Sequence, residues 1–183
     1  GGPSSQQEID RLRSALGLAP GEPYLLHVGG NHWYKNRPGV LRIFQALCNA
    51  LEEAGSPPLR LIMAGEPFTP QMREYVRANN LDRSVIEVAA PTDADLRALY
   101  TGALALLFPS LYEGFGWPII EAQSCGCPVI TSNRAPMTEV GAASALYIDP
   151  ADEAAAAAQI AANLPGLPLL REVALHMVER AGI

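Results

Sequence analysis

The sequence has few cysteines, and their number and spacing exclude two kinds of site. The three cysteines, Cys48, Cys125 and Cys127, cannot all pair within the chain. One residue separates Cys125 from Cys127, a spacing that suits neither a CxxC redox motif nor an ordinary zinc site. We therefore expect buried free thiols in a protein of the reducing cytoplasm.

The sequence also has little charge and no long apolar run. Charged residues make up 17% of the chain, and the net charge of −6 comes without an evident basic face, so we expect no nucleic-acid partner. A small anionic ligand is still compatible with this balance, because a few local cations and helix N-termini can outweigh the overall sign. No apolar run reaches the roughly 18 residues of a membrane span. The N-terminus lacks the charged-then-apolar pattern of a signal peptide, and we expect a cytoplasmic protein.

What the sequence has in quantity is apolar residues, which make up 49% of its 183 positions without any low-complexity tract. Such a composition is typical of a globular chain and not of a disordered one. The length is sufficient for one compact domain with a sizeable core. No linker or shift in composition divides the chain.

Short apolar runs alternate with segments of helical periodicity along almost the whole chain. The apolar runs predict six strands, at residues 24–30, 59–65, 84–90, 103–110, 127–133 and 144–150. Apolar spacing and capping residues predict helices over residues 37–55, 69–81, 92–102, 118–124, 151–164 and 167–183. Strands that are apolar throughout and alternate with helices indicate a parallel sheet covered on both faces. We predict an α/β fold, a Rossmann-like doubly wound parallel sheet. A TIM barrel would need two more βα units and about 250 residues.

Ligands of a doubly wound sheet bind beyond the C-terminal ends of the strands. The segments that follow predicted strands include GGNHWYKNR at residues 29–37, AAPTD at 89–93 and SLYEGFGW at 110–117. The last of these opens a stretch with two glutamates eight positions apart, Glu113 and Glu121. This edge of the sheet is where we expect the functional site.

The residues between the two glutamates suit a ligand with both phosphates and sugar rings. Gly114 and Gly116 remove side chains just before a helix N-terminus, so that a ligand can approach the backbone N–H groups closely. Pro118 fixes the helix start and leaves neighbouring N–H groups free to bind an anion. A carboxylate such as Glu113 or Glu121 can accept hydrogen bonds from two vicinal hydroxyls, as the ribose-binding acid of a dinucleotide fold does.

Purely structural explanations exist for the same residues. In the first turn of a helix, Glu121 would stabilise the macrodipole by ~0.3–1 kcal/mol without any further role. Glu113 is equally compatible with a solvated loop position, and Lys35 with a solvated loop cation. The GxG at residues 114–116 lacks the third glycine of the dinucleotide fingerprint and is weak evidence alone.

The segment PSLYEGFGWPIIEAQSCGCPVITSN, residues 109–133, resembles the E-x7-E segment of retaining GT-B glycosyltransferases of the GT4 group. The resemblance extends, in the family's order, to YLLHVGGNHWYKNR, LRLIMAG, LDRSVIEVAAPTDADLRALYTGA and MTEVGAASALYIDPAD. It implies the C-terminal, donor-binding half of a GT-B enzyme. Such an enzyme transfers a sugar from a nucleoside diphosphate sugar to an acceptor hydroxyl, with retention at the anomeric carbon.

The resemblance also implies a role for each residue of the site. Glu113 would contact hydroxyls of the donor sugar, Glu121 would bind the ribose hydroxyls, and Lys35 would bind the diphosphate. Lys35 and Glu113 are the residues that we expect to be catalytic. The remaining donor contacts would come from the glycines after the first strand, the nucleobase loop, and the turn and helix start between the glutamates: Gly29, Gly30, Ala90, Gly114, Phe115, Gly116, Trp117, Pro118 and Ile119.

One part of the family pattern is missing. The family often places an arginine directly after the strand glycine, where this sequence has Asn31 after Gly30. We hypothesise that Asn31 or Arg37 partly compensates for this missing arginine.

Five further residues have other expected roles. His27 is either a satisfied core histidine or a catalytic residue, and His32 and Trp33 would line the donor or the acceptor site. Glu139 matches a glutamate that recurs in the family, with capping or domain packing as its expected role. His176 is expected at the surface.

The resemblance implies three sections. Residues 1–20 would form an N-terminal segment or helix leading in from a missing N-terminal domain, 21–165 the Rossmann-like nucleotide-sugar-binding domain, and 166–183 a C-terminal helix. The missing domain would supply the acceptor site and peripheral membrane association, so this chain alone would bind donor and turn over little.

We expect no cofactor and no metal ion, and the UDP- or GDP-sugar is a substrate. No DxD-type cluster lies near the site, and Lys35 can supply the positive charge. Two other functions fit the sequence, a non-catalytic nucleotide-binding module and another GT-B enzyme such as an epimerase. A phosphorylase would show a segment with a pyridoxal-phosphate lysine, and none is recognised.

Overall fold

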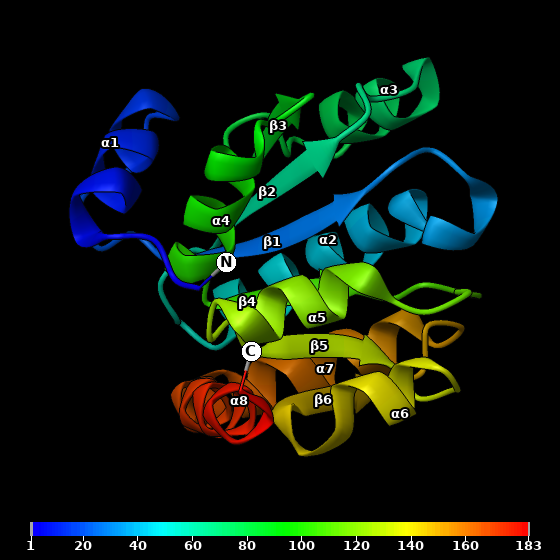
Figure 1. Ribbon diagram of the computed structural model, residues 1–183. Coiled ribbons are helices and arrows are strands. Elements are labelled where there is room, and N and C mark those ends of the chain that lie inside the picture. Colours follow the sequence, from blue (N-terminus) through cyan, green and yellow to red (C-terminus); the bar gives the residue numbers. More distant parts are fainter. Residues whose placement is uncertain (1, 183) are drawn as a thin grey trace.

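The computed structural model describes residues 2–182, which form one six-stranded parallel sheet with helices on both faces (Figure 1). The strands are β1 (Tyr24–Gly29), β2 (Arg60–Gly65), β3 (Val85–Ala89), β4 (Ala105–Phe108), β5 (Val129–Ser132) and β6 (Ala145–Ile148). Their order across the sheet is β3-β2-β1-β4-β5-β6, and all five neighbouring pairs are parallel. This is the strand order of the Rossmann fold, so the predicted fold class is confirmed.

Helices cover the sheet in two layers. In Figure 1, α2 (Arg37–Glu53) and α7 (Glu153–Asn163) lie behind the sheet, and α4 (Asp93–Gly102), α5 (Trp117–Ser124) and α6 (Met137–Gly141) lie in front. The remaining elements are α1 (Gln6–Ala15), α3 (Pro70–Ala78), α8 (Leu167–Ala181) and the 3₁₀ turns η1 (Trp33–Lys35), η2 (Ala142–Ser144) and η3 (Leu164–Gly166).

Each face of the sheet has its own apolar core. Alternate residues of a strand point to opposite faces, so Leu25 packs in one core and Leu26 in the other. The first core includes Phe44 of α2 and Ile160 of α7, and the second includes Ile119 of α5. Strands buried on both faces explain why the sequence shows unbroken apolar runs instead of alternation.

The predicted helix starts agree with the structure where a capping residue marked them. Thr69 accepts a hydrogen bond from the N–H of Met72, and Thr92 accepts one from the N–H of Asp95 in a capping box. The five-residue helix α6 was not predicted, because so short a segment has no helical periodicity to detect.

The strands are shorter than the apolar runs that predicted them. The run at 103–110 yields a strand of only four residues, β4. It stops before Pro109, which has no N–H to donate to a neighbouring strand.

Both terminal helices pack on the same unit as the sheet. Helix α1 lies against α4, with Ile9 buried, and α8 lies against α5. The guanidinium of Arg171 on α8 donates to the carbonyls of Thr101 and Ala103 at 3.2 and 2.7 Å, which joins α8 to the end of α4. Within residues 2–182, no helix is both long enough and apolar enough to cross a membrane.

The fold has its topological switch point between β1 and β4. From these neighbouring strands the chain leaves in opposite directions, toward β2 from β1 and toward β5 from β4. The loops that follow them, residues 30–36 and 109–116, project from the same edge of the sheet (Figure 1). Two hydrogen bonds join the loops, from the N–H of Leu111 to the carbonyl of Tyr34 at 2.8 Å and from the amide of Asn36 to the carbonyl of Pro109 at 2.9 Å. Ligands of such sheets bind at this point.

Candidate functional site

The two joined loops bring Lys35 and Glu113 into an ion pair. Lys35 ends η1 and Glu113 lies in the loop after β4, and the ammonium Nζ donates to Oε1 of the carboxylate. The side chains are only 17% and 4% exposed. The two residues that we predicted to be catalytic are therefore in direct contact, which excludes the interpretation of both as solvated loop residues.

Aromatic rings also hold the ammonium group of Lys35. Nζ lies 5.1 Å from the ring centroid of Phe108 and 5.6 Å from that of Tyr34, both within the range of a cation–π contact. Asn36 follows in the left-handed region at φ +57°, which lets the chain turn from η1 directly into α2. The surroundings therefore fix the position of the cation without a ligand.

A hollow of about 390 Å³ opens beside this pair. It is lined by Tyr34, Lys35 and residues 112–118, which include the whole turn that we predicted to hold the donor sugar. Gly116 adopts φ +88°, a conformation that favours glycine, whereas a side chain at Gly114 would meet no atom within 4 Å. Gly116 is thus required by the backbone, and Gly114 leaves the backbone open to the hollow.

Helix α5 begins at this hollow, with Gly116 as its N-cap and Pro118 in its first turn. Within the described part of the chain, the N–H groups of residues 114–117 have no hydrogen-bond acceptor. The N–H of Ile119 donates to the carbonyl of Gly116 at 3.0 Å. The N–H groups available to an anion therefore lie before Pro118, and Ile119 is engaged within the helix.

The glycines at the end of β1, Gly29 and Gly30, do not open onto free space. A side chain at Gly29 would lie 3.2 Å from Nε2 of His27, and one at Gly30 would lie 2.6 Å from Oε1 of Glu66. In this structure the carboxylate of Glu66 occupies the space that we predicted for the ligand at Gly30.

Arg37 and Asn31 do not take the place of the missing family arginine. Arg37 is buried, and its Nη1 donates to Oδ1 of Asn31 at 2.8 Å and to the carbonyl of Glu66 at 2.9 Å. Burial lowers the pKa of Arg37, and the carboxylates of Glu66 and Glu87 oppose that shift. Both residues join the loops after β1 and β2, so the hypothesis that they compensate for the arginine is not supported.

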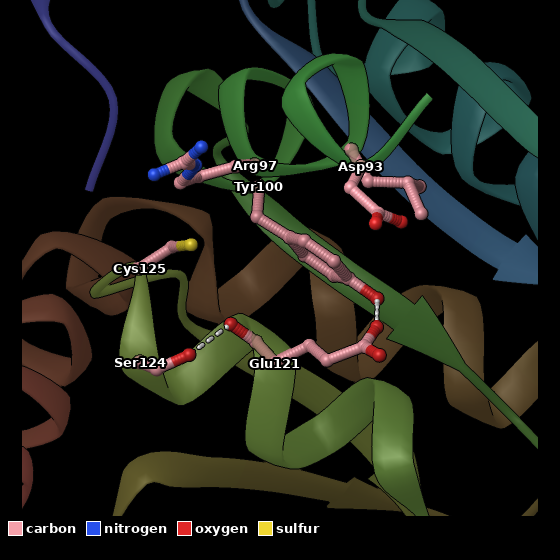
Figure 2. A pocket seen from close by; sticks show the side chains of 7 residues that line it. Asp93, Arg97, Tyr100, Glu121, Ser124 and Cys125 are labelled. Carbon is pink, nitrogen blue, oxygen red and sulfur yellow. Dashed lines mark hydrogen bonds between the residues drawn. The ribbon is translucent and has the colours of Figure 1, made fainter. Parts of the chain in front are cut away.

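Glu121 faces a second cavity, of about 310 Å³, between α4 and α5 (Figure 2). Its carboxylate is exposed and accepts a hydrogen bond from the hydroxyl of Tyr100 at 2.9 Å. The cavity is lined by Asp93, Leu96, Arg97, Tyr100, Glu121, Ser124 and Cys125. Glu121 is the fifth residue of α5 and lies beyond its first turn, so stabilisation of the macrodipole does not account for it.

Tyr100 is a site residue that sequence reasoning missed. Its side chain is buried on α4 and lines the cavity, and its hydroxyl points at Glu121 (Figure 2). Burial, followed by the nearby carboxylate, raises the pKa of this hydroxyl, so it stays protonated and donates. Tyr100 lies in the helix predicted over residues 92–102, and nothing in the spacing indicated a partner 21 residues away.

Ala90 adopts the left-handed conformation at φ +49°, which is unusual for a residue with a side chain. Its N–H donates to the carbonyl of Gly65 at 2.9 Å, which holds the turn at the end of β3. Ala90 does not line the Glu121 cavity, which begins on this segment at Asp93. The structure therefore contains an unusual backbone turn at the predicted nucleobase loop, with Asp93 and Arg97 as the side chains beyond it.

His27 is a core residue. It is fully buried, and its Nδ1 lies 2.9 Å from the carbonyl of Leu107 and donates to it. Burial lowers the pKa of His27 to about 3, so the ring is neutral and Nε2 carries no proton. Among the described residues, Nε2 has no hydrogen-bond partner. The arrangement favours the core alternative over a catalytic role.

The other candidates lie outside the two cavities. His32 and Trp33 line a separate hollow with Asn31 and Arg37. Glu139 lies in the first turn of α6, where a carboxylate is favourable.

His176 is exposed on α8, as predicted. The three cysteines are free thiols, with Cys125 and Cys127 buried and Cys48 half-buried. Among residues 2–182, no three His, Cys, Asp or Glu side chains gather closely enough to hold a metal ion.

Comparison with known proteins places the whole site in one family. Residues 8–169 match the family model described as glycosyl transferases group 1. Among curated proteins, the chain is 34% identical over 141 residues to the O-antigen chain mannosyltransferase B of Escherichia coli, covering 77% of this chain and 36% of that protein.

Solved structures share the fold. A glycosyltransferase from Rickettsia africae superposes with a TM-score of 0.80 at 20% identity, covering 97% of this chain and 48% of that one. The Anabaena protein HepE, in complex with UDP-glucose, superposes with a TM-score of 0.76 at 18% identity, covering 97% of this chain and 49% of that one. The chain thus spans about a third of the length of the curated relative and about half of each structure. With the family model matched across both loops and both cavities, the chain belongs to the group 1 glycosyl transferases.

Proposed function

We propose that this chain binds a nucleoside diphosphate sugar as the donor half of a retaining GT-B glycosyltransferase of the GT4 group. The observation that carries the proposal is the Lys35–Glu113 pair, which lies at the switch point beside the open start of α5. In a donor, the transferred sugar is bonded directly to the diphosphate. A cation for the phosphate and a carboxylate for sugar hydroxyls are therefore needed side by side, as they are found here.

The remaining contacts follow the order of groups in the donor. The diphosphate lies along the free N–H groups at the start of α5, where the helix dipole also favours an anion. Trp117 and Glu121 are four residues apart on α5, a rise of roughly 6 Å along one face. The ribose, held by Glu121, then lies one helical turn beyond the diphosphate. The nucleobase then lies toward Asp93 and Arg97 of α4, which line the same cavity as Glu121.

In the reaction, Lys35 stabilises the charge that develops on the departing diphosphate. The bound diphosphate shares the ammonium with Glu113, and this frees carboxylate oxygens for the hydroxyls of the donor sugar. No side chain is assigned as a separate nucleophile, in keeping with a front-face reaction. We propose no metal ion and no other cofactor, because Lys35 and the start of α5 supply the positive charge.

The acceptor hydroxyl comes from a partner domain of the full-length protein, which closes over the edge of the sheet. Two findings support this proposal: the relatives extend well beyond the matched segment, and the named relatives include an O-antigen chain mannosyltransferase. The chain alone binds donor and turns over little. We propose a cytoplasmic location, with membrane association through the partner domain.

Thermal unfolding of the chain with UDP, GDP and ADP tests the proposal. A ligand that binds only the native state at 100 times its dissociation constant stabilises that state by about 2.7 kcal/mol. At least one nucleotide is expected to raise the melting temperature, and Glu121→Gln to reduce the rise. Leu169→Ala on α8, which lines neither cavity, serves as the control. If all three nucleotides leave the melting temperature unchanged, the chain is not a donor-binding domain.

A further inference from the structure

The exposed large apolar side chains of this protein are concentrated around the Lys35–Glu113 pair. Among the described residues five such side chains are exposed, and four of them are aromatic: Trp33 at 73%, Tyr112 at 62%, Phe115 at 51% and Trp117 at 64%. The fifth, Leu169, lies on α8. Two short loops therefore carry nearly all the exposed apolar bulk of the surface.

Together with Tyr34, the exposed aromatic side chains form two groups of neighbouring rings, which we call the aromatic rim: Trp33, Tyr34 and Tyr112 in one group, Phe115 and Trp117 in the other. The ring centroids of Trp33 and Tyr34 are 5.8 Å apart, and those of Tyr34 and Tyr112 are 6.3 Å apart. Phe115 and Trp117 are 5.0 Å apart. All members except Trp33 line the hollow that contains Lys35 and Glu113, and Trp33 extends the rim outward from it.

The exposed rings of Trp33 and Tyr112 are not stacked face to face on Tyr34, so they are the stacking surfaces of the rim. Tyr34 itself has little free face, because His32 stacks on it with centroids 5.4 Å apart and Nζ of Lys35 lies over the ring. Trp33 meets Tyr34 edge-on at an interplanar angle of 87°, and Tyr34 meets Tyr112 at 85°. A ring face is negative and attracts weakly positive C–H groups. A pyranose ring presents such C–H groups on its faces and hydroxyls at its perimeter. The tips of Trp and Tyr offer an N–H or O–H to those hydroxyls.

We propose that the aromatic rim is the subsite for a pyranose ring of the acceptor, so that the acceptor is a saccharide that docks partly on this chain. The inference rests on the proposed function, because the rim gains this role from its place beside the transferred sugar. The hollow of about 390 Å³ takes the donor sugar at Glu113. The rings of Trp33 and Tyr112 stack on the acceptor ring. The acceptor hydroxyl then lies at the boundary between the donor sugar and the acceptor ring.

The lining of the hollow favours a saccharide over other occupants. A nucleobase belongs to the Glu121 cavity, which shares no residue with the rim. A lipid chain would call for aliphatic side chains, and the described residues that line the hollow include no Leu, Ile, Val or Met. Its lining combines aromatic rings, which match the C–H faces of a sugar, with one cation, one carboxylate and open glycine backbone, which match its hydroxyls.

Intrinsic fluorescence reports directly on the rim, because the two tryptophans of the chain, Trp33 and Trp117, both belong to it. We would titrate the chain with maltose, an α-linked mannobiose and lactose, and follow the tryptophan emission. Sorbitol, which has hydroxyls but no ring, is the ligand control. At least one disaccharide is expected to produce a saturable shift to shorter wavelength, and sorbitol none.

Variants test the stacking role. Trp33→Ala and Tyr112→Ala each remove one stacking surface and should weaken disaccharide binding about three- to tenfold. Trp33→Phe retains a ring face and should bind nearly as well as the parent, with Trp117 as reporter. Leu169→Ala is the matched control, an exposed apolar side chain outside the rim. Both alanine variants replace exposed side chains, and unfolding curves would verify that they fold.

The outcomes separate this inference from the proposed function. If a nucleotide raises the melting temperature but no disaccharide changes the emission, the donor proposal stands and the rim proposal is wrong. An equal response to sorbitol, or equal affinity in Trp33→Ala, Tyr112→Ala and the parent, also overturns the rim proposal. Disaccharide binding without any nucleotide effect would overturn the donor site, and with it the assignment of the rim to an acceptor.

Discussion

The site has two ends, and each holds a carboxylate in a different way. At the Lys35 end, Glu113 is buried in a loop and paired with an ammonium group. At the Glu121 end, the carboxylate is exposed on a helix and accepts one hydrogen bond from a neutral hydroxyl. Charge is already balanced at the first end, whereas the second end has free acceptor capacity. The difference fits a ligand whose phosphates meet the first end and whose ribose hydroxyls meet the second.

The largest effect is expected from Lys35→Ala, because it leaves the buried Glu113 without its cation. Breaking a buried pair costs about 3–5 kcal/mol, and partial exposure of Lys35 places the expected loss of stability at about 3 kcal/mol. The variant should also lose its preference for a diphosphate over the matching nucleoside and show a flatter salt dependence of binding. Urea unfolding measures the first effect, and calorimetry at two ionic strengths measures the second.

A matched control is the exposed pair of Arg42 and Glu153. Arg42→Ala should cost about 0.5 kcal/mol or less, because surface pairs contribute little. Equal losses in Lys35→Ala and Arg42→Ala would mean that the Lys35 end is an ordinary surface pair.

The next largest effect is a loss of ligand affinity, and it should differ between the two carboxylates according to the ligand. Glu121→Ala should weaken binding of the free nucleotide by about 1.5–3 kcal/mol, the range of hydrogen bonds to a charged group. Glu113→Ala should act mainly on the sugar-bearing donor, because its assigned partner is the transferred ring. Calorimetry with nucleotide and nucleotide-sugar measures both. Equal losses for both ligands in both variants would contradict this division.

The free energy of unfolding should fall at acidic pH because of His27, a buried histidine near the Lys35 end. His27 lies beneath that end, and its ring stacks on Phe108 with centroids 6.2 Å apart. Its pKa is lowered to about 3 in the folded state, mainly by burial, against 6.5 in the unfolded chain. Below pH 6.5 the unfolded chain takes up a proton that the folded protein does not, so stability falls as the pH falls. The expected loss from this histidine between pH 7 and pH 5 is about 2 kcal/mol.

His27→Asn should remove that part of the pH dependence, because an amide can still donate to the carbonyl of Leu107 but does not titrate in this range. His176→Asn, at an exposed histidine, is the control and should leave the pH dependence unchanged. Urea unfolding at pH 7 and pH 5 compares the variants. If the two variants lose the same stability on acidification, His27 is not buried in its neutral form.

The smallest effect is expected from Tyr100→Phe at the Glu121 end. The hydroxyl positions the carboxylate with one hydrogen bond, worth about 1 kcal/mol. Nucleotide affinity should fall by that amount, while Glu121→Ala in the Tyr100→Phe background should cost less than it does alone. A purely structural Tyr100 would lower stability instead and leave the effect of Glu121→Ala unchanged.

The sequence made the fold predictable because each signal is local. Capping residues at Thr69 and Thr92 marked helix starts, and unbroken apolar runs marked strands buried on both faces. The prediction of a site at the turn with its two glutamates also rests on local signals, since glycine, proline and carboxylate lie within nine residues, 113–121. Helix α6 was not predicted, because a segment of five residues is too short to show helical periodicity.

What the sequence by itself determined is the set of elements and the list of chemical groups at one edge of the sheet. Only the tertiary structure decided which groups meet, because contacts between residues 78 or 21 positions apart depend on how the loops and helices pack. Packing paired Lys35 with Glu113 and directed Tyr100 toward Glu121. It also buried Arg37 between two loops, although the sequence had allowed Arg37 as a partial substitute for the missing family arginine. The sequence determines which side chains can carry a charge, but the fold determines which group each side chain pairs with and how far it is exposed to solvent.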